Sequence, residues 1–98
     1  MAVESDFQSD LKDELEAMFP GAYVLKNDPK FFQGVPDVTI LMPSGRWATL
    51  ECKKSKKARH QPNQDVYVED MREKSYSAFI YPENKEEILD ELQQTFGS

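Results

Sequence analysis

Residues 35–53, VPDVTILMPSGRWATLECK, decide the fold that we expect for this chain. Two strand-like runs, residues 35–42 and 46–53, lie on either side of Pro43-Ser44-Gly45. A three-residue connection that offers a glycine for a positive φ angle is typical of a β-hairpin. The stretch therefore predicts two antiparallel strands joined by a tight turn.

The register of this hairpin brings two carboxylates together. Closure through the turn pairs Met42 with Arg46, and counting outward along both strands places Asp37 directly opposite Glu51. Side chains in opposite positions have Cβ atoms about 4.5–5.5 Å apart, and two like charges there are destabilising unless something neutralises them. A divalent cation would do so, and we therefore expect a metal site at this pair.

Strand alternation sorts the hairpin into two faces. The predicted polar face carries Asp37, Thr39, Leu41, Trp47, Thr49, Glu51 and Lys53, and the other face carries Val38, Ile40, Met42, Ala48, Leu50 and Cys52. Mg²⁺ prefers hard oxygen ligands, binds through one or two carboxylates and completes its shell with water and phosphate oxygens. The ammonium of Lys53 would stabilise charge on those oxygens or orient the attacking water, so the pattern favours phosphoryl chemistry.

The rest of the chain alternates helical and strand patterns. Helices are predicted at residues 4–19, 62–75 and 83–96, and further strands at residues 22–25 and 76–81. The order αβββαβα predicts an α/β fold in which helices flank a small mixed sheet. With 98 residues and neither repeat nor linker, we expect one domain spanning 1–98.

Positive charge is concentrated in one segment of an acidic chain. The formal net charge is −6, yet five of the 12 lysine and arginine residues lie between Lys53 and His60, where there is no acidic residue. The rest of the chain has seven cations against 18 acidic residues, a net charge of −11. We define the basic loop as Lys54, Lys56, Lys57, Arg59 and His60, and we expect it to hold the backbone of a polyanion beside the metal site.

Other classes of protein fit the sequence poorly. The single cysteine, Cys52, excludes an internal disulfide and a zinc site of the usual spacing, which favours a reducing compartment. No apolar run is long enough to span a membrane, and the first residues lack the basic segment followed by an apolar one that is typical of a secretory leader. We therefore expect a cytoplasmic protein without a membrane partner.

The motifs on the hairpin resemble those of a known family. Gly34-Val35-Pro36-Asp37, followed after 13 residues by Glu51-Cys52-Lys53, resembles the PD-(D/E)XK nuclease superfamily, whose core is a mixed sheet flanked by helices. The segment Arg59-His60-Gln61-Pro62-Asn63-Gln64 with Tyr67 resembles the Arg/Pro/Gln segment of the virus-type replication-repair (VRR-Nuc) branch. Glu4, in Glu4-x-x-Phe7-Gln8, is similar to the first-helix acid that assists metal binding in this superfamily.

The resemblance implies a Mg²⁺- or Mn²⁺-dependent deoxyribonuclease that acts as a homodimer in a bacterial or phage-infected cell, with DNA as the polyanion held by the basic loop. It implies a catalytic set of Asp37, Glu51, Lys53 and Gln64, and metal ligands Glu4, Asp37, Glu51 and the backbone carbonyl of Cys52. Related junction resolvases cut branched DNA as two-fold dimers, which present two sites in opposite senses. We therefore expect a structure-specific endonuclease of the Holliday-junction-resolving type; the alternatives are an exonuclease or nicking enzyme that needs a partner protein, and a catalytically silent DNA-binding module.

Each site residue also has a purely structural interpretation. Asp37 could be a turn residue after proline, and Glu51 and Lys53 could lie on a solvated strand face. The basic loop could be a solvated loop or a general polyanion patch.

The residues taken from the family motifs have structural alternatives of their own. Gln64 could simply begin its helix, and Tyr67 could belong to the core. Glu4 could stabilise the helix dipole, with Glu14 as the second candidate for the first-helix acid. His60 could act as a general base, although a phosphate contact is the commoner role.

Overall fold

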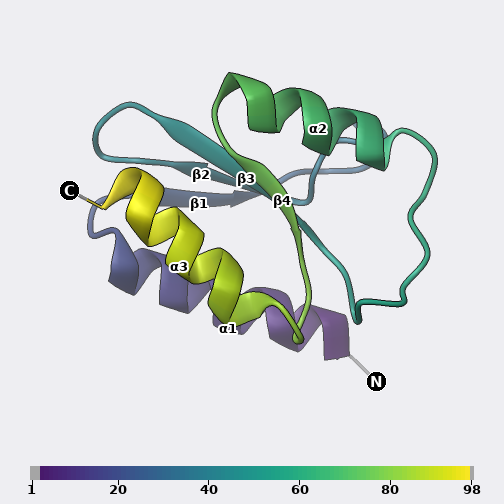
Figure 1. Cartoon of the computed structure of the whole chain (residues 1–98), viewed down its shortest axis with the longest axis horizontal. Coiled ribbons are helices and arrows are strands. Elements are labelled where there is room, and N and C mark those ends of the chain that lie inside the picture. Colours follow the sequence, from purple (N-terminus) through teal and green to yellow (C-terminus); the bar gives the residue numbers. More distant parts are fainter. Residues whose placement is uncertain (1–2, 98) are drawn as a thin grey trace.

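The computed structural model describes residues 3–97, and the side chains of residues 6–97. Its elements follow the predicted order αβββαβα: α1 (Val3–Met18), β1 (Tyr23–Lys26), β2 (Val38–Leu41), β3 (Trp47–Cys52), α2 (Gln64–Lys74), β4 (Ser77–Ile80) and α3 (Lys85–Phe96). The predicted α/β architecture, a small mixed sheet flanked by helices, is confirmed (Figure 1). No helix within residues 3–97 is long and apolar enough to cross a membrane.

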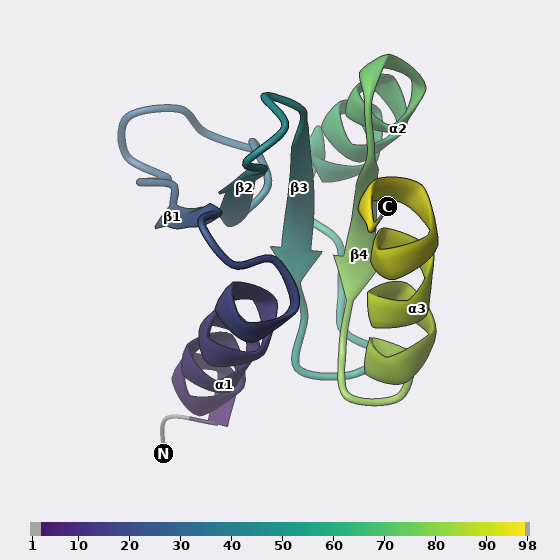
Figure 2. The ribbon, with the colours of Figure 1, turned by 90° about the vertical axis from the view of Figure 1, so that its left-hand side faces the viewer.

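The sheet has the order β1-β2-β3-β4. β1 pairs with β2 and β2 with β3 in antiparallel fashion, whereas β3 and β4 are parallel, so that their arrows point the same way in Figure 2. The β2–β3 register pairs Val38 with Leu50, and the Met42 N–H donates to the Arg46 carbonyl at 2.8 Å. The register predicted from the turn is therefore confirmed.

The two hairpin strands are shorter than predicted. β2 begins at Val38 rather than residue 35, because Pro36 has no N–H to donate to a ladder. β3 ends at Cys52 rather than residue 53. Asp37 and Lys53 therefore lie just outside the strand ends, while Glu51 lies within β3.

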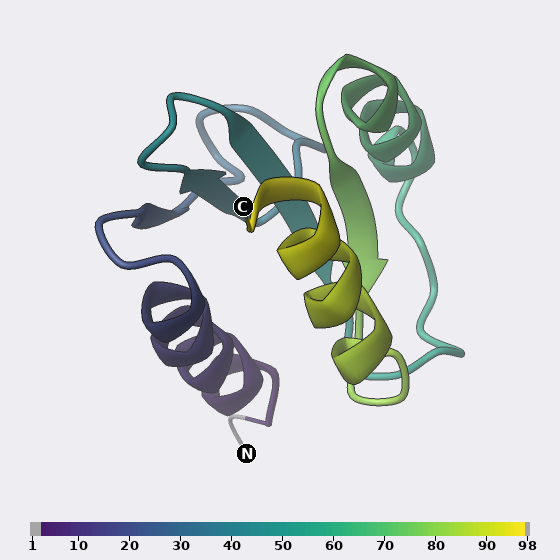
Figure 3. The same cartoon turned by 60° about the vertical axis from the view of Figure 1, so that its left-hand side comes forward.

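The two faces of the sheet are covered by different helices. α2 packs on β3 and β4, whereas α1 packs against β1 and α3 against β4; Figure 3 shows α2 and α3 on opposite sides of β4. The hairpin side chains of the predicted apolar face are all buried, and with α1 and α3 they form the core. On the opposite face α2 covers only half of the sheet, and the β1–β2 half leaves Tyr23, Leu25 and Leu41 exposed.

Candidate active site

Two carboxylates meet where β2 begins and β3 ends. One step beyond the Val38–Leu50 pair, the register places Asp37 opposite Glu51, as predicted. Asp37 is half-buried, and its Oδ2 accepts the N–H of Cys52 at 3.1 Å, which holds it against β3. Glu51 is buried, with 4% of its surface exposed. The pair thus combines one nearly dry carboxylate with one that still reaches solvent.

The environment of Glu51 disfavours its charge. Burial, and then the negative charge of Asp37, raise the pKa of Glu51 from 4.5 to about 8. The ammonium of Lys53, whose Nζ lies 3.9 Å from Glu51 Oε2, opposes this increase only in part. When both carboxylates are ionised, the single ammonium of Lys53 leaves one negative charge in excess at the strand ends.

Gln64, the first residue of α2, connects Glu51 to Lys53. Its Nε2 donates to Glu51 Oε2 at 2.9 Å, and its Oε1 accepts from Lys53 Nζ at 2.7 Å. Gln64 Oε1 also accepts the N–H of Gln61 at 2.9 Å, while Lys53 Nζ donates to the carbonyl of Arg59 at 3.1 Å. The structure therefore brings together Asp37, Glu51, Lys53 and Gln64, with both buried side chains held in place.

The donor set fits a hard divalent cation. Among the residues with described side chains, no group of three or more His, Cys, Asp and Glu side chains is arranged to hold a metal. Mg²⁺ does not require such a cage, since it binds through one or two carboxylates and keeps several waters. The Cys52 side chain is buried in the core on the opposite face, so only the backbone of this residue borders the carboxylates.

The two candidates for a first-helix acid have different outcomes. Glu4 belongs to the first turn of α1, but its side chain lies outside the described residues, so its predicted role stays a prediction. Glu14 forms an ion pair with Lys85 of α3 and is not brought to the Asp37–Glu51 pair.

The basic loop leads directly from Lys53 to α2. Lys54, Lys56, Lys57 and Arg59 are exposed. His60 is stacked on Phe79 at 4.0 Å between ring centroids, and its Nδ1 lies 2.8 Å from Asp65 Oδ1. Since Phe79 pairs with Glu51 in the β3–β4 register, the loop is anchored one strand away from the carboxylates.

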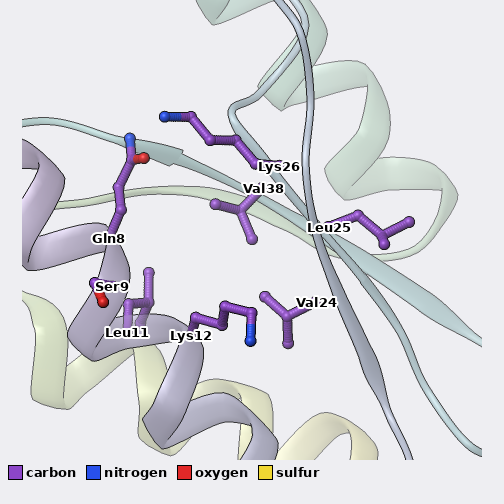
Figure 4. A pocket seen from close by; sticks show the side chains of 8 residues that line it. All are labelled: Gln8, Ser9, Leu11, Lys12, Val24, Leu25, Lys26 and Val38. Atoms are coloured by element: carbon purple, nitrogen blue, oxygen red, sulfur yellow. The ribbon is translucent and has the colours of Figure 1, made fainter.

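A separate hollow of about 300 Å³ lies between α1 and β1. Figure 4 shows Gln8 and Lys26 on one side of it, Lys12 and Val24 on the other, and Val38 between them. Val38 points to the core face, opposite to that of Asp37 and Glu51. Among the side chains of residues 6–97, no carboxylate and no histidine lines this hollow, and neither Asp37 nor Glu51 borders it, so it is not the site that the motifs predict.

Asn27 was missed as a site residue. Its Nδ2 donates to the Pro36 carbonyl and to Thr39 Oγ1, and its N–H donates to the Asp37 carbonyl at 2.7 Å. Asn27 thus holds the chain on both sides of Asp37. The sequence shows it only as part of a turn signal, Asn27-Asp28-Pro29. The available hint is its position, directly after a strand and at the start of a long loop.

No family model matches the sequence, and no curated protein does. Two solved structures share the fold. One, described as a VRR_NUC domain, is 24% identical with a TM-score of 0.71 over 98% of this chain and 99% of that chain. The other, described as a VRR_NUC domain protein, is 18% identical with a TM-score of 0.71 over 98% of this chain and 89% of that chain. The resemblance predicted from the motifs is thus confirmed at the level of the fold.

Proposed function

We propose that the protein is a divalent-metal-dependent endodeoxyribonuclease that hydrolyses phosphodiester bonds and prefers branched DNA. The observation that carries this proposal is the opposed pair Asp37 and Glu51, joined through Gln64 to a buried Lys53. The likeness to VRR_NUC domains supports it, because these share the fold over nearly the whole chain.

Asp37 and Glu51 would hold Mg²⁺ or Mn²⁺, with Glu4 and the Cys52 carbonyl as the further proposed ligands. When bound, such an ion polarises the phosphate and lowers the pKa of a coordinated water. Lys53 uses two of its three N–H donors on Gln64 and Arg59, which leaves one for a phosphoryl oxygen. Gln64 keeps Lys53 and Glu51 in their relative positions throughout the reaction.

DNA would reach this site along the basic loop. The exposed side chains of Lys54, Lys56, Lys57 and Arg59 are suited to phosphate contacts, which position the duplex without reading its sequence. The chain is acidic elsewhere, so attraction for DNA is directed to this side. A two-fold dimer would present two such sites in opposite senses, as paired incisions across a branch point require.

The test uses purified protein and labelled four-way, flap, single-stranded and linear DNA, with and without Mg²⁺ or Mn²⁺. We expect metal-dependent cutting that is most efficient on branched substrates, and its loss in Glu51→Gln, which should still bind DNA. Undiminished cutting by Glu51→Gln would contradict the assigned site. Calorimetry that shows no Mn²⁺ binding, together with no cutting, would instead indicate a silent DNA-binding module.

A further inference from the structure

The face that carries the carboxylates continues beyond them as a trough. Thr39 pairs with Thr49 on this face, two residues along the strands from Asp37 and Glu51, a step of roughly 7 Å. A hollow of about 410 Å³ opens here, with Thr39 and Thr49 in its lining. Its volume falls in the range of small-ligand sites. The trough therefore adjoins the candidate active site.

The lining of the trough comes from the sheet, from α2 and from the loop between β1 and β2. Met71 belongs to α2, and Phe31 and Phe32 belong to the loop. The Phe32 ring meets Tyr67 of α2 edge to face, with 5.5 Å between ring centroids. The loop thus bridges the open half of the sheet and touches the helix that covers the other half.

We call residues 27–37, between β1 and β2, the phenylalanine loop, and hydrogen bonds hold its residues 28–32 in a defined turn. The N–H groups of Phe31 and Phe32 donate to the carbonyl of Asp28 at 3.0 and 3.2 Å. The carboxylate of Asp28 is engaged within the loop, because its Oδ1 accepts the N–H of Lys30. Asn27 ties the base of the loop to Asp37. The rings are therefore presented by an ordered segment that begins and ends at the site.

Two aromatic rings on this turn are exposed and could contact a ligand. Phe31 is 90% exposed and Phe32 50% exposed, and two exposed lysines, Lys26 and Lys30, lie nearby in the chain. Aromatic rings beside cations are the features by which proteins hold single-stranded nucleic acid, since bases stack on the rings and phosphates pair with the cations. The paired bases inside a duplex do not offer their faces to such a ring.

We infer that this trough binds an unpaired base of the DNA strand beside the phosphate that is cut, with the Phe31 ring stacked on that base. The inference rests on the proposed nuclease function and narrows its substrate class. The preferred DNA then has at least one unpaired nucleotide at the cut, as in a flap, a fork or an opened branch point. A fully paired linear duplex lacks this contact and binds more weakly.

The test measures binding by the Glu51→Gln chain, so that the DNA stays intact. The probes are a fork with 2-aminopurine in its single-stranded arm next to the branch, and the fully paired duplex of the same sequence. We expect Phe31→Ala and Phe31→Leu to weaken fork binding about tenfold, because base–aromatic stacking has that strength, and to leave duplex binding unchanged. Phe31→Trp should retain the affinity, and only chains with a ring should quench the probe.

Controls separate stacking from other causes. Phe31 is almost fully exposed, so its variants should unfold at the temperature of the parent chain. Val66→Ala, at an exposed apolar position on α2, should bind the fork as the parent does. Equal fork binding by the parent chain, Phe31→Ala and Phe31→Leu would overturn the inference. So would a loss of dimer on Phe31→Ala without a loss of DNA binding, which would make this surface an interface between two copies.

The outcome for the trough is independent of the outcome for catalysis. If wild-type protein cuts DNA but the Phe31 series is flat, the nuclease stands and the trough fails. If no DNA is cut with any metal, but fork binding still depends on an aromatic ring at position 31, the trough is a base-binding site and the proposed nuclease function is wrong.

Discussion

Two polar clusters connect the sheet to its helices, and their charges balance differently. In one, Glu91 of α3 accepts from the Tyr76 hydroxyl at 2.6 Å and from Arg72 Nη2 at 3.4 Å. In the other, Gln64 joins Glu51 to Lys53, and the nearby Asp37 adds a second negative charge.

The first cluster has one carboxylate for one guanidinium, so its charges balance. The second is complete only when a proton or a cation joins the two carboxylates. Buried charge that the protein itself does not balance is a mark of a functional site. The same substitution should therefore have opposite consequences in the two clusters.

The largest expected effect concerns Lys53. Lys53→Met keeps the length and bulk of a side chain that is 8% exposed but removes its charge, so the phosphoryl oxygens lose an electrostatic partner. We expect single-turnover cleavage to fall by about 100-fold or more. The control is Lys54→Met, the exposed neighbour, which should change the rate by less than about threefold. Equal losses in both variants would assign Lys53 to general attraction for DNA.

The second prediction compares Glu51→Gln with Glu91→Gln in the absence of metal. Glu51→Gln removes a charge that burial, and then the neighbouring Asp37, disfavour, and it should raise the free energy of unfolding at pH 8 by roughly 2 kcal/mol. Glu91→Gln removes a charged acceptor that two groups share and should lower the same free energy by about 1 kcal/mol.

Urea unfolding measures both changes, and DNA cleavage provides the second readout. Cleavage should be lost in Glu51→Gln and retained in Glu91→Gln, because Glu91 contacts neither the carboxylate pair nor the basic loop in the hydrogen bonds and ion pairs of the described residues. Destabilisation by Glu51→Gln would show that the metal-free protein already balances this charge.

The third prediction is a pH dependence of metal-free stability. The folded protein holds a proton on Glu51 up to a pKa of about 8, whereas the unfolded chain releases it near 4.5. The stability from this group is therefore complete below pH 4.5 and is lost as the pH rises to 8. We expect the free energy of unfolding of the wild-type protein to fall by roughly 3 kcal/mol between pH 5 and 8 through this group. In Glu51→Gln this contribution should not change with pH.

Thermal unfolding at several pH values measures that profile, and added Mg²⁺ should flatten it. A cation that binds only the folded state should raise the unfolding temperature of wild-type protein most at pH 8, where both carboxylates are charged. A wild-type profile that matches that of Glu51→Gln would show that Glu51 titrates normally.

Local sequence patterns predicted the hairpin and its carboxylate pair, because a turn and a period-two alternation specify a register without further contacts. The opposition of Asp37 and Glu51 follows from counting outward from Pro43-Ser44-Gly45. Gln64 came from a family motif, since its contacts with Glu51 and Lys53 join segments 13 and 11 residues apart.

The remaining features depend on how the elements pack. The stacking of His60 on Phe79 requires the parallel pairing of β4 beside β3, which no local pattern specifies. The trough forms because the phenylalanine loop reaches α2, where Phe32 contacts Tyr67. No local sequence pattern predicts this contact. Two adjacent phenylalanines, Phe31 and Phe32, lie between the strands predicted at residues 22–25 and 35–42, and they were the available signal because connecting segments are usually polar.

The smallest expected effect concerns the basic loop. The logarithm of the DNA-binding constant falls with the logarithm of the salt concentration, and each phosphate contact that is lost reduces the steepness of this fall by about one. The double variant Lys56→Gln and Lys57→Gln should therefore reduce the slope by up to about two, and affinity should fall equally for all DNA sequences. The control is Lys12→Gln on α1, where an exposed lysine already pairs with Glu16, so that its charge is compensated before DNA arrives. An equal reduction in both proteins would mean that the whole chain, rather than the loop beside Lys53, attracts the DNA.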